Sequence, residues 1–397
     1  MSVRQAQAVE AALLAGIFVV AAFLRFDQVW HRGLIYWDEG KFALEGVRML
    51  AYMQSWFGTH LVSYAGKTVG TAKPTHALLI GLSYVIFGVH DYASVYVEGF
   101  CSVLEIGCLY VLARKLFGPS VALIAALFLA VSEYDVIYAR SALSESDADL
   151  LFLVGATIWA LSWTRWEGAE GSRAGPSGWL ILVSGIVLGL AFTVNYRLSV
   201  YIGVLVVTDV VMVLRRQGWK RGVRHLLLWV GGVLAFPVLW QIIDLVAQLA
   251  GVVMFRSEVN ILISSNGHVL FRGAREGGAE WYLLQALFQL HGGSGRIFQF
   301  YPLPYLQWFV LREGWTVSLL VLAGAVFALR FRLFAWTVPA VLVFVPYVVY
   351  IFAPYIVPRN LDAALPFASL LAAAALATIV ERVQPYLVQR TVLVLLT

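Results

Sequence analysis

Charged residues are scarce in this sequence of 397 residues. Asp, Glu, Lys and Arg make up 13% of it, whereas a soluble domain carries about 25% charged residues. Hydrophobic residues make up 61%, and apolar stretches long enough to cross a bilayer recur along the whole chain. These stretches are continuous rather than alternating, which argues against a transmembrane β-barrel. The composition predicts an all-α polytopic membrane protein.

Several other features are missing. The two cysteines, Cys101 and Cys108, lie seven positions apart in one apolar stretch, and on a helix that separation is roughly 10 Å, too far for a disulfide. No pair of histidines has the spacing of a metal site. The absence of an internal repeat argues against an ordinary secondary transporter. The net charge of +5 comes from short loops between apolar stretches, so it does not indicate a nucleic-acid partner.

Hydropathy predicts about 11 transmembrane helices in a single domain, 1–397, with no soluble C-terminal domain. We expect the spans at 9–26, 95–113, 119–138, 150–164, 179–194, 198–214, 226–248, 314–329, 333–352, 361–380 and 385–397. The first span lacks a small-residue cleavage site, so we expect it to be retained.

Lys and Arg cluster in alternate loops, most densely between Arg215 and Arg224. The positive-inside rule places these loops and the N-terminus on the cytoplasmic side of a cell membrane. The remaining loops then lie on the outer side. The first outer loop, 27–94, contains an amphipathic stretch after Asp38 and an apolar stretch, 74–88, too short to cross. We therefore expect two interfacial helices there, and a second long outer loop, 249–313.

Carboxylates and cations gather at the outer ends of the predicted spans. They are Asp38, Glu39, Lys73, Arg140, Glu145, Asp147, Arg197 and Arg359. Asp38 as a helix N-cap, with Glu39 favouring the helix dipole, is the simplest explanation of the acidic pair. The convergence of both signs at one side of the membrane favours a second one, the transfer of a group from a lipid phosphate. Cations would stabilise the anionic leaving group, and a carboxylate would accept the proton of the acceptor.

Four segments carry a family resemblance: "FLRFDQV…YWDEGKFALEGVRM", "AKPTHALLIGLSYVIFG", "ARKLFGPSVALIAALFLAVSEYDVIYARSALSESDADLLF" and "YIVPRNLDAALPFASLLAAAAL". In order and spacing they resemble the dolichyl-phosphate-mannose protein mannosyltransferases and aminoarabinose transferases of the GT-C superfamily. The resemblance covers most of the first 160 residues and about 25 residues near the C-terminus.

The resemblance implies an inverting glycosyltransferase that moves a single sugar from a polyprenyl-phosphate donor to a protein, lipid or glycan acceptor. Asp38 would be the catalytic base and Glu39 would shape the acceptor site. Lys73, Arg140 and Arg359 would bind the lipid phosphate, and Arg197 lies on a tight outer turn within reach. Relatives also carry an acidic residue in the second outer loop. Here that residue is either Glu145 or Asp147. Family members differ in whether they bind a divalent metal, so a metal stays open.

In relatives the loop that corresponds to 249–313 covers the site. By this resemblance we expect a lid that orders on binding, with Arg256, Arg272 and Arg275 facing either the site or lipid headgroups.

The sequence also departs from the family pattern. Thr75 replaces a proline, Asn360 replaces a tyrosine, and Glu98 stands in the second span where relatives often carry an arginine nearby. For Glu98 we expect structural pairing with Arg140 or Arg48, or with a partner subunit. These departures keep an alternative in view, a non-catalytic GT-C-like subunit or lipid-sugar binding protein within a larger membrane complex.

Overall fold

The computed structural model describes residues 2–57, 68–71, 73–167, 177–249, 253–255, 302–331, 333–352 and 357–396. Helices make up nearly all of these residues, as expected for an all-α membrane protein. The helices are α1 (Val3–Phe26), α2 (Val29–Arg32), α3 (Trp37–Phe57), α4 (Pro74–Phe87), α5 (Asp91–Phe117), α6 (Pro119–Val131), α7 (Glu133–Ala139), α8 (Ser146–Glu167), α9 (Gly178–Val194), α10 (Ser199–Gln217), α11 (Trp219–Leu249), α14 (Pro302–Phe331), α15 (Phe334–Tyr350) and α16 (Leu365–Leu396). Two short 3-10 helices, η1 (Tyr196–Leu198) and η2 (Pro358–Ala364), precede α10 and α16.

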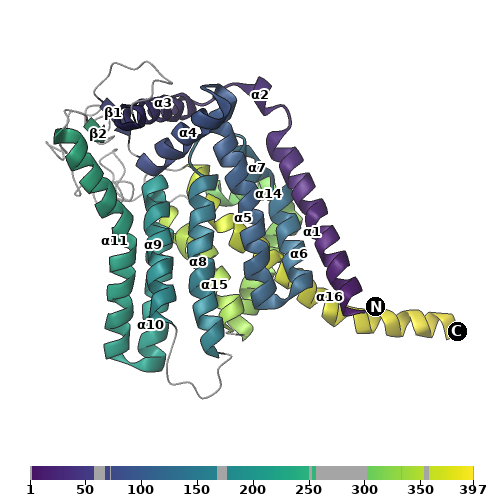
Figure 1. Cartoon of the computed structure of the whole chain (residues 1–397). Coiled ribbons are helices and arrows are strands. Elements are labelled where there is room, and N and C mark those ends of the chain that lie inside the picture. The colour runs from purple at the N-terminus through teal and green to yellow at the C-terminus, as the bar shows by residue number, and fades with distance from the viewer. Residues whose placement is uncertain are drawn as a thin grey trace.

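The long helices form one bundle (Figure 1). Helix α9 packs between α8 and α11, and α16 packs against α6, α14 and α15. Glycines bring α9 and α11 close together, because a Cβ on Gly189 would lie 2.4 Å from the carbonyl oxygen of Val233. Small residues at such crossings allow the close backbone contact that stabilises helix pairs in a membrane.

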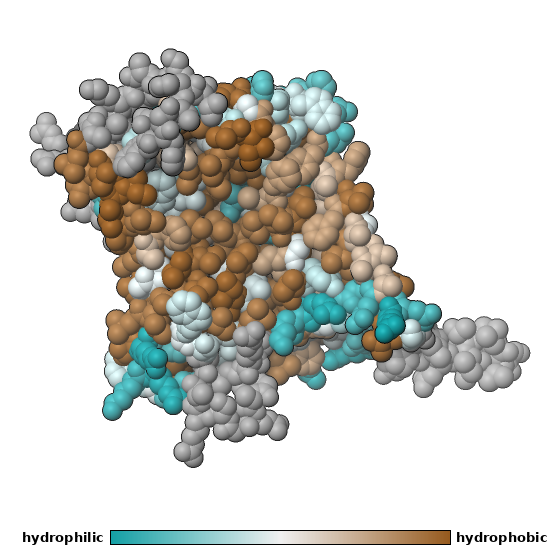
Figure 2. All heavy atoms as spheres, in the orientation of Figure 1, coloured by the Kyte–Doolittle hydropathy of each residue, from teal (hydrophilic) through white to brown (hydrophobic). Residues whose placement is uncertain are grey.

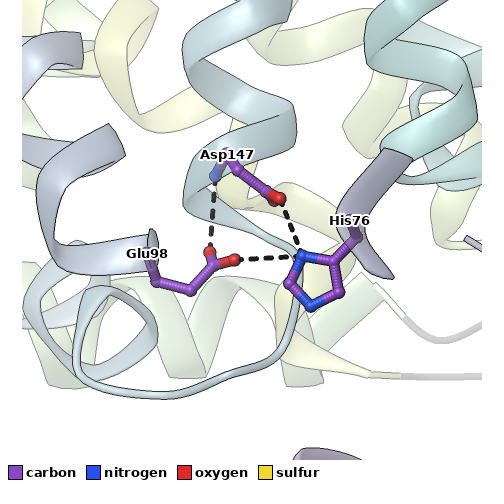
Figure 3. A group of neighbouring side chains, drawn as sticks. All are labelled: His76, Glu98 and Asp147. Atoms are coloured by element: carbon purple, nitrogen blue, oxygen red, sulfur yellow. Dashed lines mark hydrogen bonds and ion pairs between the residues drawn. The ribbon is translucent and has the colours of Figure 1, made fainter. Parts of the chain in front are cut away.

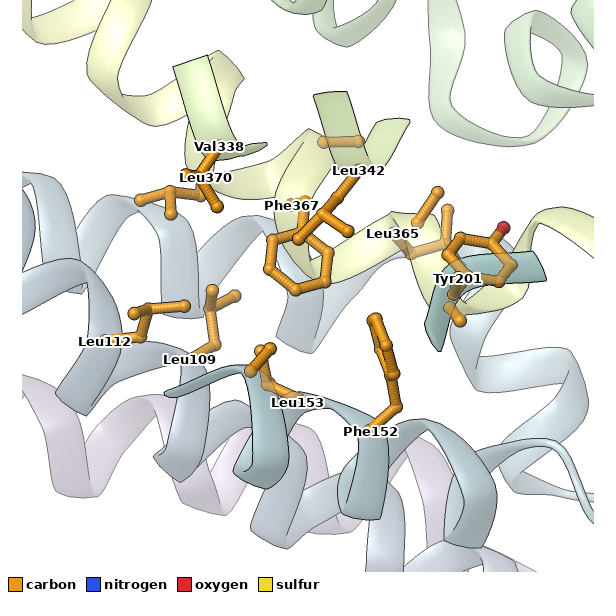
Figure 4. Packing of buried hydrophobic residues seen from close by; sticks show 14 of the residues in the cluster. Leu109, Leu112, Phe152, Leu153, Tyr201, Val338, Leu342, Leu365, Phe367 and Leu370 are labelled. Atoms are coloured by element: carbon orange, nitrogen blue, oxygen red, sulfur yellow. The ribbon is translucent and has the colours of Figure 1, made fainter. Parts of the chain in front are cut away.

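The core of the bundle joins helices that are distant in sequence (Figure 4). Phe152 on α8 contacts Tyr201 on α10 and Phe367 on α16, with ring centroids 5.6 and 6.0 Å apart. Lipid tails are as apolar as these side chains, so packing rather than removal from water stabilises this contact.

The surface agrees with a membrane environment. Hydrophobic residues cover the middle of the visible face, and hydrophilic residues lie at its lower end and along part of its upper edge (Figure 2). Among the described residues, six helices are long and apolar enough to cross a membrane, or seven if α6 and α7 count as one bent span. Helices α4, α9 and α15 are apolar but shorter. The protein is therefore a multi-pass membrane protein, and this result does not confirm a count of 11 spans.

Three boundaries differ from the sequence-based expectation. The span expected at 119–138 is two helices, α6 and α7, bent by 58° at Ser132, whose hydroxyl accepts a hydrogen bond from the backbone N–H of Asp135 and so caps α7. The two spans expected after residue 361 are one helix, α16, because its charged residues Glu381 and Arg382 are good helix formers and do not end it. Residues 302–313, expected in a loop, are the first turns of α14, which kinks at Gly314.

Helices α3 and α4 pack against each other at one end of the bundle, and the N-terminus of α1 lies at the other end (Figure 1). A small parallel sheet that the sequence did not predict lies beside them: β1 (Thr68–Thr71) pairs with β2 (Val253–Phe255). Helix α5 packs against both α3 and α4 here, and α7 and α8 pack against α5 and against each other. This end of the bundle brings the predicted site residues together.

Candidate active site

Asp38 lies in the first turn of α3, where a carboxylate favours the positive end of the helix dipole. The helix begins at Trp37, so Asp38 is inside the helix and not its N-cap. Its Oδ2 accepts a hydrogen bond of 2.9 Å from Nη2 of Arg359, in η2. The Asp38 side chain is 38% exposed. It therefore combines a fixed cationic partner with access from outside.

The charges around Asp38 favour its ionised form. Burial of the carboxyl acts to raise its pKa, but the hydrogen bond and charge of Arg359, together with the charges of Lys73 and Lys41, lower it further than burial raises it. The net result is a pKa below the ordinary value for an aspartate. Asp38 is thus a carboxylate at neutral pH.

Glu145 connects Arg359 to a second arginine. Its Oε1 lies 3.7 Å from Nε of Arg359 and 3.3 Å from Nη1 of Arg197. The other oxygen, Oε2, is buried and has no hydrogen-bond partner among the described residues. Glu145 therefore orients two guanidinium groups that come from η1 and η2, elements far apart in the sequence.

Lys73 reaches the same turn of the chain from the start of α4. Its Nζ donates a hydrogen bond of 2.5 Å to Oγ of Ser144 and lies 4.5 Å from the ring centroid of Phe42. Ser144 has a positive φ of 65°, and its carbonyl accepts a hydrogen bond from Nδ2 of Asn195. A non-glycine residue held in this conformation is a feature that clusters at functional sites. Of the predicted cations, Lys73, Arg197 and Arg359 thus meet around residues 144–145.

A cavity of about 490 Å³ opens beside Asp38 and Arg359. Its wall is mainly aromatic and apolar, with Arg312 contributing a further cation. The lining residues are Tyr36, Trp37, Asp38, Tyr134, Ile137, Tyr138, Leu143, Trp308, Arg312, Val357, Pro358 and Arg359. An apolar wall with a few convergent polar groups is typical of a small-molecule site.

Glu39 does not line this cavity. Its buried carboxylate accepts hydrogen bonds from Nη1 of Arg32 and from the backbone N–H groups of Ile35, Tyr36 and Ala142. These bonds link the segment before α3 to the 141–145 turn. The structure therefore places Glu39 behind Asp38, where it holds the two segments together.

Arg140 also points away from the cavity. Its guanidinium donates hydrogen bonds of 2.8 and 2.9 Å to the carbonyl oxygens of Leu24 and Asp27. These carbonyls are the last acceptors of α1, which a basic side chain satisfies well. The guanidinium of Arg140 thus caps α1 rather than joining the other cations.

The side chain of Asp147 points away from that of Glu145, although the two residues are only two positions apart. It faces His76 and Glu98, and all three side chains are fully buried (Figure 3). Glu98 therefore pairs with His76, and the expected pairing with Arg140 or Arg48 is wrong for the described residues. The lid residues Arg256, Arg272 and Arg275 lie outside the described residues.

The cavity wall and Ser144 were not predicted from the sequence. Tyr138, Trp308 and Arg312 line the cavity, and Ser144 bonds Lys73. The sequence offered one signal, the position of Tyr138 two residues before Arg140 in a segment that carries the family resemblance. Nothing in the local pattern singles out Trp308 or Arg312.

Comparisons with known proteins agree with this architecture. A family model described as dolichyl-phosphate-mannose-protein mannosyltransferase matches residues 71–243, which is less than half of the chain. A search of curated proteins finds no match.

Solved structures share the fold. ArnT from Cupriavidus metallidurans, bound to undecaprenyl phosphate, is 16% identical with a TM-score of 0.63 over 92% of this chain and 60% of its own. The oligosaccharyltransferase AglB from Archaeoglobus fulgidus, in complex with an inhibitory peptide and a dolichol-phosphate, is 14% identical with a TM-score of 0.56 over 96% of this chain and 52% of its own. A structure of the Archaeoglobus fulgidus oligosaccharyltransferase with Zn and sulfate has a TM-score of 0.51 at 12% identity, over 96% of this chain and 51% of its own.

The chain thus spans 60% of the length of ArnT and about half of the oligosaccharyltransferase. At these identities the structures establish the fold alone, and the family match adds sequence similarity in the region from α4 to α11. The resemblance to GT-C superfamily glycosyltransferases is therefore confirmed, in sequence over residues 71–243 and in fold over most of the chain.

Proposed function

We propose that this chain is a glycosyltransferase that moves one sugar from a polyprenyl-phosphate donor to a hydroxyl- or amine-bearing acceptor. The observation that carries the proposal is the hydrogen bond between Asp38 and Arg359 at the mouth of the aromatic cavity. It provides an ionised carboxylate beside a space large enough for a sugar. ArnT with undecaprenyl phosphate and AglB with dolichol-phosphate add support, since both share the fold.

Asp38 is the catalytic base in this proposal. As the acceptor oxygen or nitrogen attacks the anomeric carbon of the donor sugar, its proton passes to the Asp38 carboxylate. The bond between that carbon and the phosphate oxygen breaks, and the electron pair stays on the phosphate. A carboxylate whose pKa is held low by Arg359 is ionised and ready to accept the proton across the physiological pH range. Attack from the side opposite the leaving phosphate inverts the configuration at the anomeric carbon.

The cations beside Glu145 bind the phosphate in this proposal. Lys73, Arg197 and Arg359 approach residues 144–145 from three separate elements. The leaving phosphate gains negative charge as the bond breaks, so preplaced cations stabilise the transition state more than the ground state. Arg140 has no part in this role, because its guanidinium bonds the end of α1.

The residues around Asp38 do not fit a divalent metal between Asp38 and Glu145. The guanidinium of Arg359 lies between these two carboxylates, 2.9 Å from one and 3.7 Å from the other. A dication placed there would be repelled by the arginine, and Arg359 already supplies positive charge at that position. We therefore assign the electrostatic role there to Arg359.

The aromatic cavity binds the sugar of the donor or the acceptor in this proposal. Flat faces such as those of Tyr138 and Trp308 suit the apolar face of a sugar ring. The site faces the outer side of the membrane, since the Arg215–Arg224 cluster belongs to the opposite end of the bundle (Figure 1) and basic loops are cytoplasmic.

The test is mass spectrometry of lipids that co-purify with the wild-type chain and with Asp38→Asn. Loss of a general base slows turnover by about 10²- to 10⁴-fold, so the variant should accumulate a glycosylated polyprenyl-phosphate whose mass names the sugar. Asp91→Asn, at the exposed start of α5, is the matched control and should purify like the wild type. Ordinary phospholipid alone in every sample would contradict the proposal. A stable co-purifying protein, with function unaffected by Asp38→Asn, would favour the non-catalytic subunit.

A further inference from the structure

Three buried side chains from three separate elements converge behind the candidate active site. His76 lies in the first turn of α4, Glu98 in α5 and Asp147 in the first turn of α8. Nδ1 of His76 lies 2.7 Å from Oδ2 of Asp147 and 3.5 Å from Oε1 of Glu98. Each of the three side chains is fully buried, and one ligand atom of each falls within 4.8 Å of the others (Figure 3).

The backbone around the cluster fixes which oxygen atoms face the imidazole. Oε2 of Glu98 accepts hydrogen bonds from the backbone N–H groups of Ser146 and Asp147, at 2.7 and 3.3 Å. Oδ1 of Asp147 accepts one from the backbone N–H of Ala148. One oxygen of each carboxylate is thus occupied, and the other is aimed at Nδ1. Such hydrogen bonds orient metal ligands in known sites.

Oε1 of Glu98 has a long ion-pair contact, 3.5 Å to Nδ1 of His76, and no hydrogen bond from any described residue. This oxygen is fully buried. A buried carboxylate oxygen without a hydrogen-bond donor carries a desolvation penalty that no such bond offsets. Its position opposite His76 and Asp147 indicates that a ligand satisfies it.

The charge of the cluster points to a dication. Within the part of the chain that the structure describes, His76 is the ion-pair partner of both Glu98 and Asp147. With both carboxylates ionised, a protonated His76 would neutralise one of the two negative charges. A divalent cation held by a neutral imidazole would neutralise both, and imidazole nitrogen and carboxylate oxygen are each zinc ligands.

We propose that His76 Nδ1, Glu98 Oε1 and Asp147 Oδ2 bind one divalent transition-metal ion, with zinc preferred. Three protein ligands leave a fourth position for water or a substrate atom. The ion would join α4, α5 and α8 at the end of the bundle where the 141–145 turn lies. His76 also packs against Phe42, with ring centroids 5.4 Å apart, and Lys73 Nζ lies over that same ring. The site therefore supports the position of Lys73, and it stands on its own geometry whatever reaction Asp38 performs.

The test uses the full-length chain in detergent, stripped with a chelator and titrated with Zn²⁺ or Co²⁺. The matched control is His225→Ala. His225 is also a buried histidine beside a carboxylate, Asp209, but both oxygens of Asp209 already accept bonds from the Nε1–H groups of Trp159, Trp163 and Trp229. The wild type and His225→Ala should each bind one zinc per chain by elemental analysis. Co²⁺ should give the visible absorption of a site with nitrogen and oxygen ligands.

His76→Ala, Glu98→Gln and Asp147→Asn should each weaken zinc binding by about tenfold or more, because each removes a direct ligand. Glu98→Gln and Asp147→Asn keep the side-chain volume, so they decide the matter if His76→Ala fails to fold. No stoichiometric zinc in the wild type, with no Co²⁺ absorption, would overturn the proposal in favour of a protonated His76 between two carboxylates. Equal zinc binding by the wild type and a folded ligand variant would also overturn it.

Discussion

Arg359 donates a hydrogen bond of 2.9 Å to Asp38 across 321 positions of the sequence. The two residues belong to η2 and to the first turn of α3, so this contact forms only when the C-terminal part of the bundle packs on the first helices. The same guanidinium lies 3.7 Å from Glu145. One arginine thus couples the proposed base to the proposed phosphate site.

Arg359→Gln should move the acidic limb of the pH–rate profile to higher pH. Arg359 lowers the pKa of Asp38 through its hydrogen bond and its charge. Its removal lets burial raise that pKa, and protonated Asp38 cannot act as a base. The rate should therefore begin to fall at a higher pH than in the wild type, and the plateau rate should also drop because a phosphate partner is lost. The measurement is turnover of a sugar-charged lipid between about pH 3 and about pH 8, a range that includes the ordinary aspartate pKa of about 3.9.

Arg312→Gln is the control for this profile. Arg312 also lines the cavity and pairs with Glu133, and it is not among the charges that lower the pKa of Asp38. The Arg312→Gln variant should therefore show the acidic limb of the pH–rate profile at the same pH as the wild type. An unchanged limb in Arg359→Gln would show that Asp38 does not control the reaction.

Lys73→Met should weaken binding of polyprenyl phosphate by about tenfold or more, since it removes a charged hydrogen-bond donor. Lys73 meets Ser144 at the turn that also carries Glu145. Arg140→Gln should leave this affinity within about threefold, because its guanidinium bonds the carbonyls of Leu24 and Asp27. The measurement is equilibrium binding of the lipid phosphate to purified protein in detergent. A larger loss in Arg140→Gln than in Lys73→Met would reverse the assignment of the two cations.

The sequence predicted the main elements of the bundle because long apolar stretches have little alternative to a helix in a membrane. It also predicted that Asp38, Lys73 and Arg359 would lie at one end. Arg197 and Glu145, on short turns between spans, met that expectation as well. Span ends on the same side must come together in a bundle, so residue positions along the chain were enough here.

The directions of the side chains could not be predicted in the same way. Glu39 and Asp38 are neighbours, but a helical turn points them to different sides, and Glu39 accepts backbone hydrogen bonds. Asp147 lies in the first turn of α8 and faces His76, whereas Glu145 precedes that helix and faces Arg197 and Arg359. His76 lies in the stretch 74–88 that was expected at the interface, and its side chain is fully buried. Short strands such as β1 were also missed, because pairing with β2 depends on a residue more than 180 positions away.

A buried ion pair between Arg25 and Asp135 should be a strong determinant of stability. Arg25 is fully buried and also donates hydrogen bonds to Ser102 and to the carbonyls of Ala130 and Leu129. Arg25→Met leaves the Asp135 carboxylate uncompensated, which costs about 3–5 kcal/mol in comparable sites. The measurement is the thermal transition of the purified protein in detergent, read from tryptophan fluorescence.

The double variant Arg25→Met with Asp135→Leu separates charge from packing. It removes both ions, so it should recover part of the stability that the single variant loses. Arg114→Gln is the second control, because Arg114 pairs with Glu10 at an exposed position and should change the transition little. A single variant as stable as the wild type would show that this pair does not hold α1 to α7.

Thr75 replaces a family proline, and its hydroxyl links α4 to two other helices. Oγ1 of Thr75 lies 2.7 Å from Oγ1 of Thr193 on α9 and accepts a 2.9 Å hydrogen bond from Nε1 of Trp240 on α11. Thr75→Val keeps the shape but removes the hydroxyl that bonds Trp240 and Thr193, which should cost about 1–3 kcal/mol. Thr75→Ser retains the hydroxyl and should stay close to the wild type in the same thermal assay. Thr75→Pro should resemble the valine variant, because a proline at the second helical position removes the hydroxyl without disturbing an intrahelical bond. If valine and serine variants melt together, the hydroxyl does not tie these helices, and the departure from the family pattern is neutral for stability.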